Sequence, residues 1–270
     1  MSPSAFEGRV RSVPPPPLPQ RSSGSHFYRY GATEHLEWLE PVILEHKLYI
    51  PLASTFNDLR DARPRLEEKT AGEWAAYLRF RVPHTNLPAD QIRFVNQLEE
   101  IVADLGPQKI HEMATSGWHE KTENHRIYCL SKRWDNLSMW EWYAARQTGY
   151  CLEFLRAGIF LDVRDVVYQA PPAYDLTDIS NATSPSWFFY KYLDWSNEEE
   201  VRLVLARKQG GPIFEVGPDL LTRVILGEDM AKENADRIRG MALKRNPPVP
   251  VVTAKWDAIH SKFALVDREL

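Results

Sequence analysis

The feature that most constrains the fold is a change of hydrophobic period close to residue 125. From Arg65 to about Lys121 the apolar residues keep helical spacing, broken by Pro83, Pro88 and Pro107. After that point, short segments alternate between apolar and polar residues or are continuously apolar, as is typical of strands. We therefore predict an α+β fold: a single domain with a mixed, mostly antiparallel sheet and a helical insertion at 65–121 after the second strand.

Eight segments carry the strand pattern, and four further segments carry a helical one. The predicted strands are Phe27–Gly31, Lys47–Pro51, His125–Ser131, Gly149–Leu155, Val163–Gln169, Glu200–Arg207, Thr222–Gly227 and Val249–Ala254. The predicted helices outside the insertion are Thr33–His46, Asn136–Ala145, Pro185–Asp194 and Met230–Leu243.

The N-terminal 25 residues differ from the rest of the chain in composition. Pro14 to Pro17 form a run, and Ser22, Ser23, Gly24 and Ser25 follow it. Such a stretch buries too little apolar surface to offset the entropy of ordering it. We predict a disordered tail over residues 1–25, with a polyproline II segment, and a domain over 26–270.

Charge and cysteine content limit the environment and the partners. The net charge is −4, so the overall charge gives no general affinity for nucleic acid. Arg60, Arg63 and Arg65 lie close together in the sequence, however, and leave a nuclease or nucleic-acid-binding function as one hypothesis. No apolar run approaches the roughly 18 residues that span a bilayer. With only Cys129 and Cys151, a disulfide framework is excluded. These features favour a cytoplasmic protein without a membrane partner.

Common cofactor and metal motifs are not found. The chain has no GxGxxG or GxxxxGK[ST] loop, and no HExxH or CxxC pair, so we expect no resident metal. There is also no GxSxG nucleophile elbow.

An aromatic segment at 138–154 is the first candidate site. Its sequence is SMWEWYAARQTGYCLEF, and Trp140 and Tyr143 stand three residues apart on a predicted short helix. Residues at that spacing share a helix face, which could form a platform for a ring-shaped ligand, whereas Trp142 lies on another side. Packing of all three rings in a core gives the same pattern.

A charged segment, WSNEEEVRLVL at 195–205, is the second. In an extended chain, alternation places Glu198, Glu200 and Arg202 on one face and the apolar Leu203 and Leu205 on the other. If that charged face lines a cleft, Arg202 can hold a carboxylate and one glutamate can do chemistry. A solvated sheet edge would also fit.

A third candidate pairs FYRY at 27–30, which includes Arg29 and Tyr30, with STFND at 54–58. Short polar residues such as Asn57 and Asp58 also close turns by bonding backbone N–H groups, so a structural turn is the alternative here.

The order of these segments resembles a bacterial family described only as the domain of unknown function 2971. The matching segments, over roughly 27–266, are FYRY, KLYIPLASTFNDL, IYCLSKRWDNLSMWEWYAARQTGYCLEF, KYLDWSNEEEVRLVL and VILGEDM. The chain departs from the family pattern at Leu59, where the family has proline after FND. The resemblance itself implies no activity.

The same order of parts is more distantly similar to ADP-ribosyltransferase-like domains. That similarity implies an enzyme that uses NAD as substrate and breaks its nicotinamide–ribose bond, in a toxin or defence context with an unknown macromolecular acceptor. It further implies that Arg29 or Tyr30 contacts the adenosine side and that Trp140 or Tyr143 packs on nicotinamide. Glu200, or else Glu198, would then stabilise the developing cation.

A non-catalytic module that binds a nucleotide or a protein is the alternative class. The enzyme hypothesis requires Arg29, Trp140 and Glu200 to converge on one pocket, whereas a binding module does not. Fold alone does not decide between the two.

Overall fold

The computed structural model describes residues 17–58, 60–63, 65–81, 97, 100–122, 125–175, 186–206 and 211–267. Its chain separates into two compact units. The first unit comprises Met1–Leu18, Arg63–Thr122 and Pro171–Phe188, and the second comprises Pro19–Ala62, Glu123–Ala170 and Phe189–Leu270. The predicted helical insertion thus belongs to the first unit, and the main sheet lies in the second.

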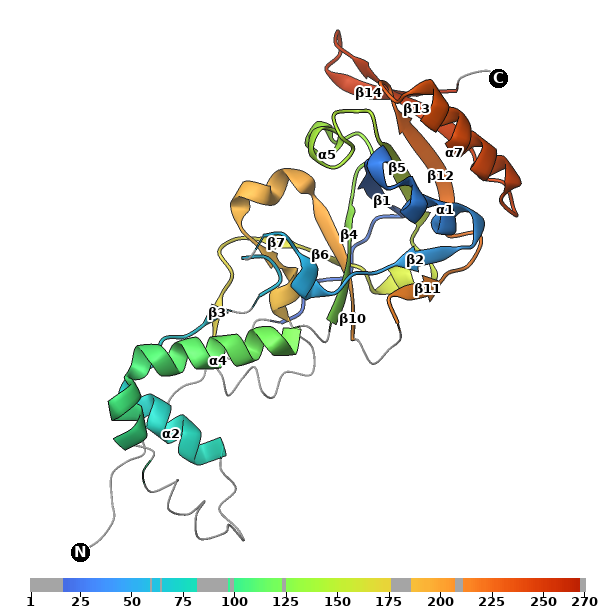
Figure 1. Cartoon of the computed structure of the whole chain (residues 1–270). Helices are drawn as coiled ribbons and strands as arrows, with labels where there is room; N and C mark the ends of the chain where they lie inside the picture. The colour runs from blue at the N-terminus through green and yellow to red at the C-terminus, as the bar shows by residue number, and fades with distance from the viewer. Residues whose placement is uncertain are drawn as a thin grey trace, which may run out of the picture. The chain divides into compact units, whose positions relative to one another are not determined.

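The main sheet has eight strands in the order β14-β13-β12-β5-β1-β4-β10-β6. Every neighbouring pair is antiparallel except β12 and β13, which the crossover helix α7 connects in parallel (Figure 1). The strands are β1 His26–Gly31, β4 His125–Ser131, β5 Tyr150–Leu155, β6 Arg164–Asp165, β10 Glu200–Ala206, β12 Leu221–Gly227, β13 Val251–Asp257 and β14 Lys262–Val266. The mixed, mostly antiparallel sheet matches the prediction.

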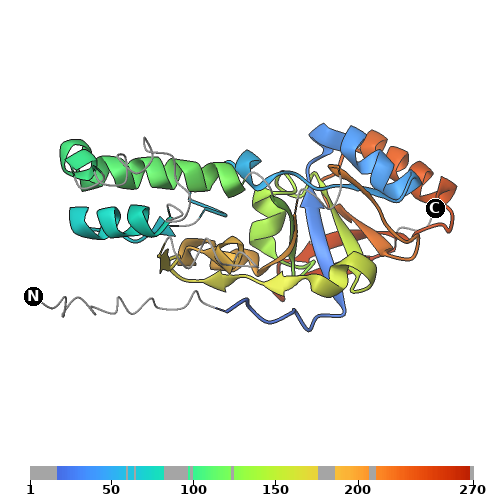
Figure 2. The same ribbon diagram turned by 90° about the horizontal axis from the view of Figure 1, so that it is seen from below.

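Two helices cover one face of this sheet. Helices α1, Leu36–Leu44, and α7, Lys232–Lys244, lie side by side, as Figure 2 shows. Their apolar residues join the larger core with Phe27, Leu203 and Phe154, all essentially inaccessible to solvent. Because side chains alternate along a strand, the apolar residues Val201 and Leu203 point into this core while Glu200 and Arg202 point to the other face.

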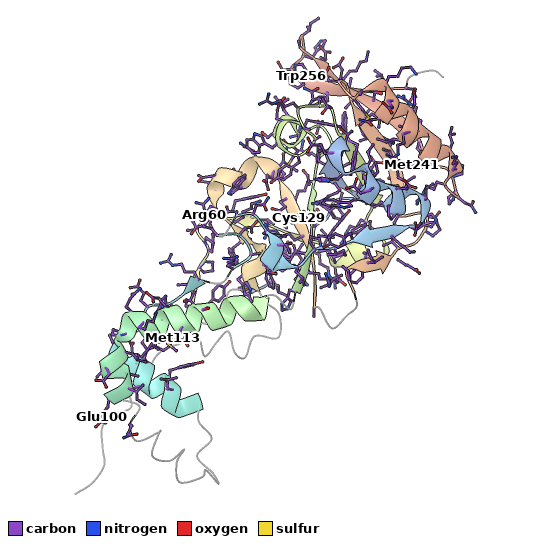
Figure 3. The ribbon with its side chains drawn as sticks, viewed as in Figure 1. Arg60, Glu100, Met113, Cys129, Met241 and Trp256 are labelled. Atoms are coloured by element: carbon purple, nitrogen blue, oxygen red, sulfur yellow. The ribbon has the colours of Figure 1, made fainter. Side chains whose placement is uncertain are left out.

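Helix α5, Leu137–Trp142, packs with a second, smaller core on that other face. The Asn136 side chain caps the helix by accepting a hydrogen bond from the Met139 N–H at 3.3 Å. After the helix, Ala145, Arg146 and Gln147 all have positive φ and form a left-handed turn. In Figure 3, Cys129 on β4 lies among the central strands, whereas Trp256 and Met241 lie towards β13 and α7.

Short elements complete the second unit. Strand β2, Lys47–Tyr49, pairs with β11, Ile213–Glu215, rather than with the main sheet. Strand β7, Val167–Tyr168, pairs in parallel with β9, Tyr190–Lys191. The short 3₁₀ helices of this unit are η1 Thr33–His35, η2 Ala53–Thr55, η3 Gly158–Asp162 and η5 Leu193–Glu198.

The first unit is mainly helical. Helices α2, Ala71–Arg81, and α4, Pro107–Thr122, lie side by side, and residues 100–105 are also helical (Figures 1 and 2). The insertion begins, however, with a two-residue strand, β3 Arg65–Leu66, which pairs with β8, Ala173–Tyr174. The expectation of an all-helical insertion is therefore wrong at its first residues. Helix η4, Ser186–Phe189, also begins in this unit.

Three further predictions need correction. The helix predicted at 185–194 is instead split into η4, β9 and η5, and the strand predicted at 163–169 is split into β6 and β7. Of the tail predicted to be disordered, residues 1–16 lie outside the described residues. Residues 19–25 are docked: the Ser22 N–H donates to the Val163 carbonyl at 3.0 Å, and Arg164 donates to the Pro19 carbonyl at 2.7 Å. Backbone pairing along the edge of the sheet holds this segment despite its composition.

Within the described part of the chain, no helix combines the length and the apolar character that crossing a membrane requires.

Candidate functional site

A row of polar side chains crosses the sheet on the face that α5 covers. Glu200 lies opposite Ser131, Ser131 opposite Tyr28, and Tyr28 opposite Glu153 on neighbouring strands. Residues directly opposite one another project to the same side of a sheet. Arg29 follows Tyr28 in the same strand and therefore projects to the opposite face from Glu200.

One end of this row is a buried ionic cluster, which we define as Asp61, Lys191, Glu198, Glu200 and Arg202. Arg202 has no solvent-accessible surface. It donates through Nε to Glu200 Oε1 at 2.6 Å, and through Nη2 to Glu200 Oε2 at 3.0 Å and to Asp61 Oδ2 at 2.7 Å. Lys191 Nζ donates to Glu198 Oε2 at 2.5 Å and to Glu200 Oε2 at 3.0 Å. The two cations thus link all three carboxylates.

Local backbone geometry brings Glu198 into this cluster. Strand β10 begins only at Glu200, and Glu198 ends helix η5. Glu199 between them adopts a left-handed conformation with φ 46°, and its side chain forms an ion pair with Arg133 at 3.3 Å. The structure therefore brings Glu198, Glu200 and Arg202 together, as the sequence spacing suggests. Glu200 and Arg202 share a face through strand alternation, whereas Glu198 joins them through a turn.

The two glutamates of the cluster have opposite pKa shifts. Burial opposes ionisation of Glu200, but the charges of Arg202 and Lys191 outweigh it and hold its pKa far below the ordinary 4.5. Burial and the nearby Glu200 charge raise the pKa of Glu198 above 4.5, although Lys191 acts against them. For Lys191, burial disfavours the charge, yet Glu200, Glu198 and Asp61 together raise the pKa. Of the two glutamates, Glu198 is therefore the one that holds a proton more readily.

A surface hollow adjoins the cluster and is lined by Trp142, Tyr143, Asp194 and Trp195. Its volume is about 500 Å³. The rings of Trp142 and Trp195 meet nearly at right angles, with centroids 6.2 Å apart and an interplanar angle of 82°. We refer to this cavity as the aromatic hollow. A volume of several hundred Å³ and an aromatic lining are typical of small-molecule sites.

Tyr143 joins the aromatic hollow to the buried ionic cluster. Its side chain is partly exposed at the hollow, and its hydroxyl donates to Glu198 Oε1 at 2.6 Å. Burial, followed by the Glu198 charge, raises the pKa of Tyr143, so this hydroxyl remains a donor. Trp195 makes a second connection, because Lys191 Nζ lies 5.1 Å from the centroid of its ring.

Trp140 and Tyr30 are not part of the hollow. Both are buried in the smaller core, where their rings meet edge to face at 5.2 Å. Trp140 Nε1 donates to the Trp134 carbonyl at 2.8 Å, and the Tyr30 hydroxyl donates to the Arg133 carbonyl at 2.8 Å. The prediction that Trp140 shares a platform with Tyr143 is therefore wrong, because Trp140 is buried in the smaller core whereas Tyr143 lines the hollow.

Arg29, Asn57 and Asp58 also lie outside the hollow's lining. Arg29 donates to the Cys129 carbonyl at 2.8 Å and lies over the Tyr128 ring. Asp58 accepts hydrogen bonds from the Arg60 N–H and guanidinium, as a turn-closing residue does, and Asn57 is exposed. Leu59, where the chain departs from the family pattern, lies outside the described residues. The convergence of Arg29, Trp140 and Glu200 on one pocket does not occur.

Sequence reasoning missed five residues of the site: Asp61, Lys191 and Asp194, together with the rings of Trp142 and Trp195. A signal existed for some of them, because Trp195 begins the charged segment and Lys191 and Asp194 come just before it in KYLDWSNEE. Asp61 carried no such signal, since it meets Arg202 from 141 positions away.

The described residues contain no group of three or more His, Cys, Asp or Glu side chains arranged to hold a metal ion. No family model matches the chain, and comparisons with curated proteins and with solved structures likewise find no match. The similarities to the domain of unknown function 2971 and to ADP-ribosyltransferase-like domains thus stay predictions, and function has to be argued from geometry.

Proposed function

We propose that the protein is a binding module for a small ligand, and that the ligand occupies the aromatic hollow. The observation that carries the proposal is the hydrogen bond between Tyr143, which lines the hollow, and the buried Glu198. A group with a shifted pKa directly beneath a cavity is a feature of functional sites. A ligand that contacts Tyr143 in the hollow is linked to the buried ionic cluster by one hydrogen bond and does not contact the cluster directly.

The make-up of the buried ionic cluster supports a functional role. Removing charges from water is costly, and well-packed apolar residues often stabilise a core as well or better. Five ionisable side chains at no more than 8% exposure are therefore an expensive way to build a core. A role in ligand binding would explain this cost, because the cluster contacts two residues that line the hollow: Glu198 accepts a hydrogen bond from Tyr143, and Lys191 lies over the Trp195 ring.

A ligand screen on paired variants tests this proposal. The probes are NAD, ATP and small organic cations, and the readouts are the melting temperature and tryptophan fluorescence. We expect at least one probe to bind, and Trp195→Ala to weaken that binding about tenfold or more, as loss of an aromatic anchor does. Trp38→Ala is the matched control, since Trp38 is 60% exposed on α1 and lies outside the hollow. Equal losses in the two variants would refute the site.

Cleavage of NAD is the second candidate function, and one observation favours it. Tyr143, which the distant similarity would place against nicotinamide, does line the hollow, with a carboxylate one hydrogen bond behind it. That carboxylate is Glu198, whereas both oxygens of Glu200 are held by Arg202 and Lys191. In such an enzyme the bond between nicotinamide and ribose would break, nicotinamide would leave as the neutral base, and an acceptor, either water or a macromolecule, would bond to the ADP-ribosyl group and release a proton.

Nicotinamide release from NAD tests this second candidate. If Glu198 stabilises the developing cation, Glu198→Gln should reduce the rate by 10²-fold or more, as expected when a charge that stabilises a transition state is removed. Glu199→Gln is the matched control, because Glu199 points to the surface beside Arg133. If the unmodified protein releases no nicotinamide, NAD cleavage is refuted and the binding function is the remaining proposal.

A further inference from the structure

The shape of the aromatic hollow restricts which ligands it can enclose. Trp142 and Trp195 stand at 82° to each other, so they form two walls of a corner, to which Tyr143 adds a third ring. A flat ligand ring can stack between two parallel aromatic rings, but it can stack on only one of two rings that stand at a right angle. A compact, rounded group can contact both π faces of a corner at once.

The charge around the hollow favours a cation. Asp194 lines the hollow directly, and in the cluster beneath it three carboxylates meet two cations. Arg60, a surface cation that interacts with Asp194, is itself paired with Asp58 at 3.2 Å. The balance of these groups is negative. Aromatic faces attract cations through the negative charge above their rings, and cages of two or three such rings bind methylated ammonium groups.

Lys191 does not cancel this attraction. It lies 5.1 Å from the Trp195 ring but already donates to Glu198 and Glu200. Its charge is therefore neutralised inside the cluster, and Asp194 is left to face the hollow. Asp194 is itself exposed, and no ion pair to its side chain is found among the described residues.

We propose that the ligand of the aromatic hollow carries a methylated ammonium group, such as a trimethylated amine, which packs against the three rings and which Asp194 neutralises. This inference rests on the proposed binding function and names the class of ligand. A volume of about 500 Å³ exceeds what a trimethylammonium group fills, and because the hollow is open to solvent the rest of the ligand can extend out of it.

A pair of isosteres separates charge from shape. Choline and 3,3-dimethylbutan-1-ol have the same outline, but only choline is charged. Calorimetric titration of the full chain should give a dissociation constant for choline about tenfold lower than for the neutral alcohol, in line with cation–π and carboxylate contributions. Asp194→Asn should remove most of that difference, and Trp142→Ala should weaken both ligands. Asp267→Asn, at an exposed position after β14, is the control for loss of one negative charge.

Free trimethyl-lysine and phosphatidylcholine vesicles are further arms that identify which molecule carries the group. Tighter binding of either, still sensitive to Asp194→Asn, supports the inference and identifies the carrier. If choline and the neutral alcohol bind equally well, the cation preference is wrong while the hollow remains a ligand site. If the methylated amines fail but another probe of the ligand screen binds with Trp195 dependence, the ligand class is wrong. If no probe binds, the proposed function fails as well.

Discussion

Glu198 and Glu200 stand two positions apart, share Lys191 as a partner, and have pKa values shifted in opposite directions. The difference lies in the second partner of each. Glu200 is paired with the guanidinium of Arg202, a permanent cation, whereas the second partner of Glu198 among the described residues is the neutral hydroxyl of Tyr143. The positive charges around Glu200 outweigh the effect of burial on its pKa, whereas those around Glu198 offset that effect only in part. The glutamate with the raised pKa, Glu198, is therefore the one that is hydrogen-bonded to the lining of the hollow.

The pH dependence of stability tests this assignment. Because the folded pKa of Glu198 lies above its ordinary 4.5, the folded chain holds this proton more tightly than the unfolded chain. The resulting stabilisation is complete below pH 4.5 and is lost as the pH rises through the folded pKa. Denaturant unfolding across pH 4 to 8 should show Glu198→Gln gaining stability relative to the parent protein as the pH increases. A constant difference over that range would contradict the assignment.

Glu200 should behave in the opposite way. Its folded pKa is lowered, so its stabilisation is present above pH 4.5 and is lost as the pH falls through the folded value. Glu200→Gln leaves Arg202 buried with one carboxylate partner fewer. We expect a loss of about 3 kcal/mol or more of unfolding free energy at pH 7, as for other broken buried pairs. A loss under about 1 kcal/mol would show that the cluster is more hydrated than its burial indicates.

At the scale of elements, the turn after α5 holds Trp142 and Tyr143 in place. Ala145, Arg146 and Gln147 take up a left-handed conformation that is costly for residues other than glycine. Two glycines make room for it. A Cβ on Gly227 of β12 would lie 1.9 Å from the Gln147 carbonyl oxygen, and one on Gly149 would lie 2.3 Å from the Gly31 oxygen. The sheet and the turn therefore fit together only without these side chains.

Gly227→Ala consequently forces the turn away from the sheet. We expect it to lower the unfolding free energy by about 2 kcal/mol or more, because a backbone oxygen cannot move aside as a flexible side chain does. Gly240→Ala is the matched control: it lies within helix α7, and apart from the helix's own nearby backbone no described atom lies within 4 Å of an added Cβ. The control should gain up to about 1 kcal/mol from helix propensity. Similar losses in both variants would argue against the close approach of turn and sheet.

The sequence predicts elements well wherever one local pattern decides them. The predicted strand His125–Ser131 coincides with β4, because one short segment carries the whole apolar pattern. Prediction fails in SWFFYKYLDW, where aromatic residues at helical spacing instead form η4, β9 and η5. Those residues take their conformation from strand pairing with β7 and from burial, which a local pattern does not encode. For the site, the spacing of Glu198, Glu200 and Arg202 is informative, whereas the partnership of Arg202 with Asp61 is a product of tertiary structure.

For the whole molecule, the N-terminal segment belongs to the second unit from residue 19 onward. Arg21 forms an ion pair with Asp162 at 2.5 Å, Ser22 is 2% exposed, and the Arg156 N–H donates to the Ser25 carbonyl at 2.9 Å. These contacts run along β6 and the end of β5. The composition of the first 25 residues predicts a disordered tail. It does not predict the backbone pairing of residues 20–22 with residues 163–165 at the edge of the sheet, because that pairing depends on tertiary structure.

Truncation measures what this docked segment contributes. Deletion of residues 1–25 should lower the melting temperature by several degrees, since it exposes the edge of the sheet and removes several backbone hydrogen bonds of about 1 kcal/mol each. Deletion of residues 1–16 is the matched control, because the contacts described above all involve residues 19–25. If both truncated chains melt at the same temperature as the parent, the docked segment adds nothing to stability.

The central claim is that a ligand occupies the hollow between α5 and η5, and the indole N–H spectrum of the chain tests it most directly. The protein has nine tryptophans, which give separate nitrogen–proton signals after uniform ¹⁵N labelling. Single Trp→Phe variants assign Trp142, Trp195 and the buried Trp140. On titration with choline, or with the probe that binds best, we predict that the Trp142 and Trp195 signals shift together with one dissociation constant while the Trp140 signal stays in place. Saturable shifts confined to other tryptophans, with those of Trp142 and Trp195 unchanged, would contradict the claim.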